Sequence, residues 1–293
     1  MENNKSEAYS AIYSLLTAGY QAYLAGGCVR DELLGLNPKD YDVATSATPE
    51  QIEKIFPRTI SFAKKYGVTL VIFNSKQTVE VTTFRKDFCY QDGRRPSFVK
   101  FGTLEEDHIR RDFTINALYK DIVNDKIIDF CGGINDLKNK IIRCVGDPIA
   151  RFSEDNLRIL RAIRFSGSLN CTIEPATFAA IKHFNNKLTA VSAERVNDEL
   201  TKMLVKRNAH LSLRLLKDCG ALEQILPEFH KCIGVNQPSE FHPEGDVFTH
   251  TRLMLDALPP APPLRLALAV LLHDVGKPPT AQFATLPDGT RRW

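Results

Sequence analysis

Two aspartates separated by one residue, Asp40 and Asp42, follow closely on a glycine pair, Gly26 and Gly27. Side chains two apart in a strand point to the same face, so the two carboxylates are expected to lie together. Carboxylate oxygens are ligands that Mg²⁺ prefers, usually together with substrate phosphates. Two such ions could activate a hydroxyl nucleophile and stabilise a leaving pyrophosphate. The alternative is an ordinary surface turn, in which an Asp-x-Asp pair is common.

The glycine pair complements the aspartates because it suits a phosphate. Gly26 and Gly27 lack side chains, so their backbone N–H groups can approach a phosphate, and the helix predicted to follow would direct its positive end there. Arg30 lies in the first turn of that helix and can add a charge-assisted hydrogen bond. A glycine pair alone is a weak signal, and a tight strand-to-helix turn with a surface arginine is the alternative. Together the two motifs predict an enzyme that transfers nucleotides.

Further candidates lie along the next ninety residues or so. Glu80, in a β-rich run, is a candidate third catalytic carboxylate, or else an ordinary outward-facing strand residue. Arg111 could reach a triphosphate or a ribose. Asp112 and Asn116 are one helical turn apart and could face the sugar or fix the arginine. The alternative is a solvated helix start with Asp112 near its positive end.

A row of charged residues, spaced every third position, could select a base. It consists of Asp155, Arg158, Arg161 and Arg164. Cytosine and adenine both present an amino donor beside a ring-nitrogen acceptor, so Asp155 could accept from the amino group while Arg158 donates to the ring. Uracil and guanine present the reverse order and would leave a buried charge unpaired. The alternative is a solvated helix face with ordinary Asp–Arg pairs.

Hydrophobic periodicity predicts how these residues are positioned. Helical spacing over residues 7–20 and β-rich runs at 22–25, 41–44, 67–74 and 78–85 predict a mixed sheet with helices. Residues 86–98 are polar and turn-rich and predict a mobile loop. From residue 150 to about 226 the pattern is helical. We therefore predict an α+β fold with a mixed-sheet head over 1–145, an all-α neck and RNA-binding body over 146–235, and a further helical segment over 236–293.

Composition limits the class of protein. The 293 residues contain 43% hydrophobic and 25% charged residues, as in a globular protein with an ample core. No apolar run reaches the roughly 20 residues of a membrane helix. The seven cysteines are scattered without a Cys-x-x-Cys pair, which favours reduced thiols and a cytoplasmic location. A net charge of +3 permits an RNA partner without requiring one.

Taken together, the motifs resemble the class II tRNA nucleotidyltransferase/poly(A) polymerase family, which includes CCA-adding and A-adding enzymes. The resemblance covers about residues 20–235 and rests on six runs in family order, at 24–31, 39–42, 110–117, 129–137, 146–148 and 154–158. It implies a polymerase-β-like head, a base-recognising helical neck and Mg²⁺ ligands at Asp40 and Asp42. It also implies nucleotide contacts at Gly27, Arg30, Arg111, Asp155, Arg158, Arg161 and Arg164. The loop at 86–98 looks like the family's flexible loop, which helps the switch from C to A.

The last segment resembles the start of an HD-type domain, in residues 242–250 and 271–277. His250, His273 and Asp274 could form a partial metal site for phosphate-ester hydrolysis. Such sites need a further aspartate downstream, and the only later acid is Asp288. We therefore expect either a truncated domain or a purely structural unit.

The expected activity is the template-independent addition of CMP and AMP from CTP and ATP to the 3′ end of tRNA, with Mg²⁺ as cofactor and pyrophosphate as product. An A-adding enzyme or poly(A) polymerase on the same scaffold is the nearest alternative, and the sequence does not separate the two. Two different classes of protein stay open as well, namely an HD-type phosphohydrolase with an inactive head and a non-catalytic RNA-binding module. No membrane partner is expected, and the sequence predicts no oligomeric state.

Overall fold

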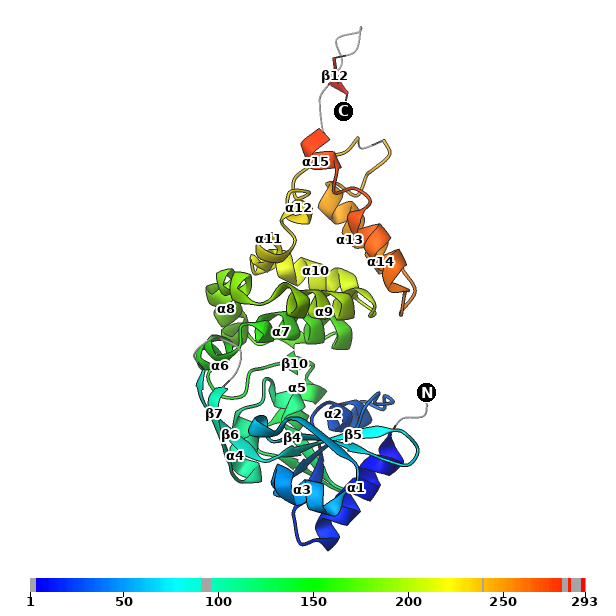
Figure 1. Ribbon diagram of the computed structural model, residues 1–293. Helices are drawn as coiled ribbons and strands as arrows, with labels where there is room; N and C mark the ends of the chain where they lie inside the picture. Colours follow the sequence, from blue (N-terminus) through cyan, green and yellow to red (C-terminus); the bar gives the residue numbers. More distant parts are fainter. Residues whose placement is uncertain (1–3, 91–95, 239, 281–283, 286–290, 293) are drawn as a thin grey trace. The chain divides into compact units, whose positions relative to one another are not determined.

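The computed structural model describes residues 4–90, 96–238, 240–280, 284–285 and 291–292 (Figure 1). The chain divides into two compact units, Met1–Glu154 and Asp155–Trp293. The finer, three-part division expected from the sequence remains a prediction. No helix in the described part of the chain is long and apolar enough to cross a membrane.

The first unit is built on a seven-stranded mixed sheet in the order β3-β4-β5-β2-β1-β8-β9. Within it β2 and β5 are parallel, whereas the other neighbouring strands are antiparallel. The strands are β1 (Ala22–Ala25), β2 (Asp42–Thr45), β3 (Thr59–Ala63), β4 (Val68–Ile72), β5 (Thr78–Thr83), β8 (Leu118–Asp121) and β9 (Lys126–Asp129). The predicted α+β fold with a mixed sheet is therefore confirmed.

Short helices and further strands complete this unit. The α-helices are α1 (Lys5–Thr17), α2 (Gly27–Leu33), α3 (Pro49–Ile55), α4 (Leu104–Ile109), α5 (Gly133–Lys138) and α6 (Pro148–Glu154). The 3-10 helices are η1 (Lys64–Tyr66) and η2 (Thr114–Asn116), and the short strand β10 is Ile141–Ile142. The helix predicted after the glycine pair is present as α2, but it begins within the pair, at Gly27.

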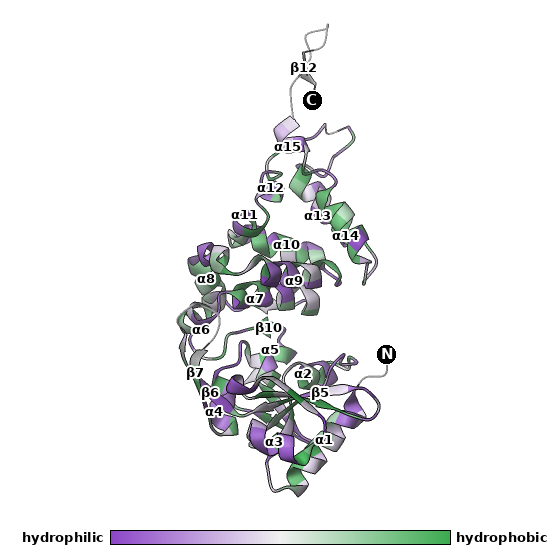
Figure 2. Cartoon of the chain, viewed as in Figure 1, coloured by the Kyte–Doolittle hydropathy of each residue, from purple (hydrophilic) through white to green (hydrophobic). Residues whose placement is uncertain are grey.

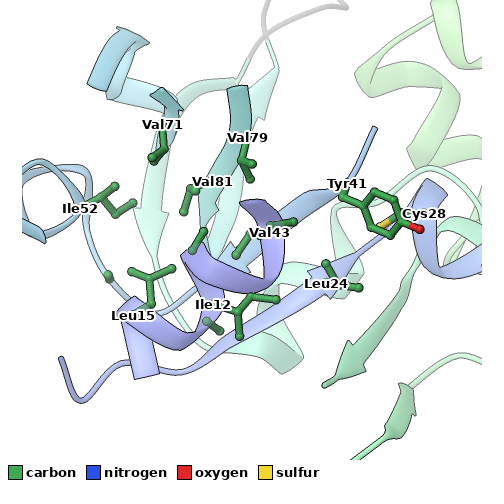
Figure 3. Packing of buried hydrophobic residues seen from close by; sticks show 14 of the residues in the cluster. Ile12, Leu15, Leu24, Cys28, Tyr41, Val43, Ile52, Val71, Val79 and Val81 are labelled. Atoms are coloured by element: carbon green, nitrogen blue, oxygen red, sulfur yellow. The ribbon is translucent and has the colours of Figure 1, made fainter. Parts of the chain in front are cut away.

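Strand alternation decides which face of the sheet becomes the core. Val43 on β2 and Val79 and Val81 on β5 are fully buried against Ile12 and Leu15 of α1 (Figure 3). Successive side chains of a strand point to opposite faces. The residues adjacent to these valines along each strand therefore face away from α1, and they include Asp42 and Glu80.

The segment predicted as a loop over 86–98 is largely an antiparallel hairpin, so that prediction is wrong for its two arms. Strand β6 (Arg85–Tyr90) pairs with β7 (Pro96–Phe101), and the rings of Phe88 and Phe98 lie 5.8 Å apart across the two strands. Such cross-strand aromatic pairs stabilise a hairpin even where most of its other residues are polar. Residues 91–95 lie outside the described residues.

The run at 129–137 holds η2 against α5. The Asp129 carboxylate accepts hydrogen bonds from the backbone N–H groups of Cys131, Gly133 and Ile134, which fixes the turn. A Cβ atom on Gly133 would lie 2.2 Å from the carbonyl oxygen of Thr114, so only glycine permits this approach. Because η2 ends at Asn116, the contact positions a residue predicted for the site.

The second unit is predominantly helical, as predicted for residues 150 to about 226. Its helices are α7 (Leu157–Leu169), α8 (Pro175–Phe184), η3 (Asn185–Ala190), α9 (Ala193–Leu204), α10 (Ala209–Asp218), α11 (Ala221–Ile225), α12 (Pro227–His230), α13 (Val247–Asp256), α14 (Leu264–Leu272) and α15 (Lys277–Thr280). Its strands are β11 (Thr172–Ile173), β12 (Ala284–Thr285) and β13 (Arg291–Arg292). Helix α7 packs against α9 and α10, and Figure 2 shows the hydrophilic side of α9 in purple.

Replacing Gly133 by alanine should destabilise the first unit by about 1–3 kcal/mol, because its new methyl group would meet an immobile backbone carbonyl. Gly102→Ala is a matched control. Its Cβ atom would also lie 2.2 Å from an oxygen, but this oxygen belongs to the Glu106 side chain, which can rotate away. The control should cost less than about 1 kcal/mol. Urea unfolding followed by circular dichroism measures both, and equal losses would contradict the role of the Thr114 contact.

Candidate active site

Asp42 and Glu80 lie side by side on the face of the sheet opposite α1. The parallel register pairs Val43 with Val81, so the residues that precede these valines are neighbours on adjacent strands. Both carboxylates are exposed, whereas both valines are fully buried. The strand pairing therefore places Glu80 beside the aspartate motif, as its predicted role requires.

Asp40 precedes β2, which begins at Asp42, so the strand alternation used to place both aspartates on one face does not itself extend to Asp40. Tyr41, between them, is buried in the core, and its hydroxyl donates to Glu32 Oε1 at 3.0 Å. Because Tyr41 points inward, the flanking Asp40 and Asp42 are left exposed. The alternation that the motif predicts is therefore present without a full strand.

The charges of the three carboxylates act on one another. The pKa of Asp42 is raised to about 7, chiefly because the protein atoms around its carboxylate displace water from it. The negative charges of Glu80 and Asp40 raise this pKa further, and the Arg111 guanidinium opposes the shift. A divalent cation would relieve the repulsion, so this donor set fits a hard metal ion.

Two of these carboxylates line a cavity of about 220 Å³, and Asp40 lies outside its lining. Asp42 and Glu80 contribute carboxylates to its wall, and Arg85, Arg110 and Arg111 contribute guanidinium groups. Carboxylates suit metal ions, and guanidinium groups suit phosphate oxygens, which they can bind through two parallel hydrogen bonds. The cavity thus has both kinds of group that a metal-bound triphosphate needs.

Arg111 lies against the glycine turn. A Cβ atom on Gly26 would lie 3.1 Å from Arg111 Nη1, and Gly26 adopts a φ of +75° that side chains disfavour. Arg111 Nε donates to the Tyr119 hydroxyl at 2.9 Å, and its Nη2 donates to Asp107 at 3.1 Å. Glycine is therefore required here both for its backbone conformation and to make room for the arginine.

Asn116 and Asp112 hold Arg30 rather than standing free. Arg30 Nη1 donates to Asn116 Oδ1 at 2.5 Å, and Asn116 Nδ2 donates to Asp112 Oδ1 at 3.1 Å. All three side chains are buried. Of the two roles considered for Asp112 and Asn116, the positioning of an arginine is thus observed, but the arginine is Arg30. Their contact with a sugar stays a prediction.

The charged row from Asp155 to Arg164, predicted to select the base, is held by α9. The Asp155 carboxylate accepts from Arg195 Nη1 at 3.2 Å and Nη2 at 2.8 Å, and Arg164 Nε donates to the buried Glu199 at 2.6 Å. Arg161 lies 4.0 Å from the same glutamate, and Arg158 is itself buried. These are not the loose pairs of a solvated helix face.

Apart from Asp112 and Asn116, the residues that hold the site residues in place were not predicted from the sequence. Asp107 could have been found, because it lies four residues before Arg111, a spacing at which side chains meet at the end of a helix. Tyr119, Arg195 and Glu199 carry no local signal, since strand and helix packing alone bring them to their partners. Residues 30, 42, 80 and 111 belong to the first unit, and the row from Asp155 to Arg164 belongs to the second.

A second cluster of metal-binding side chains occurs around α13 and α14. The structure brings together His250, His273 and Asp274, as predicted. It adds His242 and Glu244, whose Oε1 lies 3.1 Å from His242 Nδ1 and 2.5 Å from His250 Nδ1. Both added residues lie within the 242–250 motif but were not among the predicted ligands. Burial does not explain the cluster, because all five side chains are partly exposed.

Comparison with known protein families gives separate matches in the first and in the second unit. Residues 22–143 match the model of the poly(A) polymerase head domain, and residues 170–233 match that of the probable RNA- and SrmB-binding site of polymerase A. The CCA-adding enzyme of Bacillus subtilis is 41% identical over 242 residues, which cover 82% of this chain and 60% of that protein. The CCA-adding enzyme of Enterococcus faecalis is 47% identical over 207 residues, which cover 70% of this chain and 50% of that protein.

Solved structures that resemble this chain belong to the same kind of enzyme as the relatives found by sequence. The Bacillus stearothermophilus CCA-adding enzyme in complex with CTP superposes with a TM-score of 0.73 at 33% identity, covering 94% of this chain and 71% of that one. A tRNA nucleotidyltransferase complexed with a primer tRNA and an incoming ATP analogue gives a TM-score of 0.62 at 27% identity, covering 84% of this chain and 74% of that one. The chain therefore belongs to the tRNA nucleotidyltransferase/poly(A) polymerase family, and its first unit carries the nucleotidyltransferase head.

Proposed function

We propose that the protein is a template-independent nucleotidyltransferase that adds CMP and AMP from CTP and ATP to the 3′ end of tRNA. The observation that carries this proposal is the pairing of Asp42 and Glu80 in a cavity that Arg111 also lines. Relatives solved with CTP and with a primer tRNA support the choice of substrates. The chain spans 60% or less of the curated relatives' length, so the activity is proposed from the head and neck residues that it contains.

Nucleotidyltransferases of this class depend on metal ions, and we assign Mg²⁺ to the carboxylates. Asp40 and Asp42 would hold it, with Glu80 as a third carboxylate, because their mutual repulsion calls for a hard cation. When bound, Mg²⁺ would supply Lewis-acid activation of the RNA 3′-hydroxyl and charge stabilisation of the leaving pyrophosphate. Arg30 and Arg111 would bind the triphosphate near the glycine turn formed by Gly26 and Gly27.

In the second unit, Asp155 and Arg158 would select the base, as acceptor and donor to the amino group and ring nitrogen of cytosine or adenine. Arg161 and Arg164 would extend this contact along α7. We also propose a cytoplasmic location, since the six described cysteines carry free thiols, as is usual in a reducing compartment.

CTP use distinguishes a CCA-adding enzyme from an A-adding enzyme or poly(A) polymerase on the same scaffold. With tRNA substrates ending before the CCA, after the first C and after the second C, we expect CTP to extend the first two and ATP the third. Gel analysis with each nucleotide supplied singly reads this out. Extension of the first substrate by ATP without any use of CTP would favour the A-adding alternative.

Asp42→Asn should lower nucleotide incorporation by roughly a hundredfold or more, because even outer partners of a metal site contribute ten- to a hundredfold. Asp125→Asn is the control, since this aspartate is exposed at the β8–β9 turn, outside the cavity. It should leave the rate unchanged in the same primer-extension assay. Full activity of Asp42→Asn, or tRNA binding without turnover in the wild type, would instead favour a non-catalytic RNA-binding module.

Arg195→Ala should relax base selection rather than abolish transfer. The change removes both hydrogen bonds that orient the Asp155 carboxylate, so the preference for CTP over UTP should fall roughly tenfold. Arg214→Ala, an exposed arginine on α10 of the same unit, is the matched control and should keep the wild-type ratio. Single-turnover rates with each nucleotide measure the ratio, and an unchanged ratio in Arg195→Ala would argue against base selection through Asp155.

The cluster around α13 and α14 favours a second candidate function, a metal-dependent phosphohydrolase of the HD type. His273 Nδ1–H donates a hydrogen bond to the Val270 carbonyl oxygen at 2.8 Å, because a carbonyl oxygen can only accept. In that tautomer Nε2 carries no proton, so Nε2 and Asp274 Oδ2, which lie 3.1 Å apart, can both act as metal ligands. Such a hydrogen bond to a backbone carbonyl is the usual way in which a metal-binding histidine is oriented.

This candidate has its own test. Phosphate release from a phosphate ester in the presence of Mn²⁺ should survive Asp40→Ala and disappear with His273→Ala, because the first change affects only the head. The nucleotidyltransferase should show the opposite pattern in primer extension. Loss of phosphate release in both variants, or in neither, would rule out an independent hydrolase.

A further inference from the structure

Asp107, on α4, is a fully buried carboxylate that binds four neighbours. Its Oδ1 accepts from Arg110 Nη2 at 2.7 Å and from the backbone N–H of Arg85 at 3.2 Å. Its Oδ2 accepts from Arg111 Nη2 at 3.1 Å and from the Tyr119 hydroxyl at 2.7 Å. One side chain thus connects α4, the start of the β6–β7 hairpin and β8.

Burial without partners would make this carboxylate neutral. Burial does raise the pKa of Asp107, but the positive charges of Arg110 and Arg111 and the Tyr119 hydroxyl outweigh it, so that the pKa falls to about 2. Asp107 is therefore ionised at neutral pH. Removing its charge would leave two guanidinium groups without their common partner, and these are groups that the cavity depends on.

Tyr119 completes the arrangement from the other direction. Its hydroxyl accepts from Arg111 Nε at 2.9 Å while it donates to Asp107, and its ring lies under the Arg111 guanidinium at 4.7 Å. Arg111 is thus held by a carboxylate, a hydroxyl and an aromatic face. Long arginine side chains lose much conformational freedom on binding a ligand, so fixing one beforehand strengthens binding.

The three arginines in contact with Asp107 are the three that line the cavity beside Asp42 and Glu80. We propose that Asp107 is the positioning residue of the nucleotide clamp: it sets Arg110, Arg111 and the backbone at Arg85 in the arrangement that receives the triphosphate. Asp107 itself is fully buried and does not line the cavity, so it acts through the arginines. The inference rests on the proposed function, because it assigns a triphosphate to this cavity.

A double-mutant cycle in nucleotide binding tests the proposal. The dissociation constant of CTP is measured by isothermal titration calorimetry for the wild type, Asp107→Asn, Arg111→Ala and the double variant. Asp107→Asn keeps the shape and removes the charge, and it should weaken CTP binding roughly tenfold. In the Arg111→Ala background the same change should cost less than about threefold, because the arginine through which Asp107 acts is gone.

A purely structural role is separated by a matched control. Asp246 is a carboxylate with a purely structural role at the start of α13, where it accepts from the backbone N–H groups of Thr249 at 2.8 Å and of Gly234 at 2.7 Å. Asp246→Ala removes this helix cap and should lower the melting temperature without changing CTP affinity by more than about twofold. Equal losses of affinity in Asp107→Asn and Asp246→Ala would overturn the positioning role.

Tyr119→Phe keeps the proposal testable if Asp107→Asn does not fold. It removes one hydroxyl from the same network and should weaken CTP binding by roughly threefold, again only when Arg111 is present. Unchanged affinity in both variants, or additive effects in the cycle, would contradict the proposal, as would a folded wild type that binds no CTP. A wild type that binds CTP but does not extend tRNA would instead refute the proposed function and leave the cycle valid.

Discussion

The candidate active site depends on the parallel pairing of β2 with β5. That register sets Val43 beside Val81 in the core and thereby sets Asp42 beside Glu80 on the opposite face. A shift of one residue would bury carboxylates and expose valines, so the free energy of core packing fixes the register of the site as well. The carboxylates are held close despite their repulsion because the valines behind them cannot move apart.

A second feature recurs in both units. Residues with proposed contacts to substrate are held in place by hydrogen-bond partners. Asn116 holds Arg30, Asp107 holds Arg111, and Arg195 holds Asp155. A charged side chain that is already oriented loses less conformational entropy when a nucleotide binds. Such partners also satisfy the charges in the absence of substrate, which limits the cost of burying them.

The two units carry different chemistry. Hard oxygen ligands and guanidinium groups gather on the sheet of the first unit, where they suit a metal-bound triphosphate. Imidazoles dominate the cluster around α13 and α14 in the second unit, and imidazole favours transition metals over Mg²⁺. The ligand types alone therefore indicate that the two places would bind different ions.

The sequence by itself determined the α+β fold, and it located the glycine turn, the aspartate motif and the charged row from Asp155 to Arg164, because each is a local pattern of residue types and spacing. It failed for the β6–β7 hairpin, whose polar arms are stabilised by a cross-strand aromatic pair. Only the tertiary structure decided which residues hold the site. Tyr119 and Arg195 reach their partners through strand pairing and helix packing, which bring together residues too far apart in the chain for any local pattern to record.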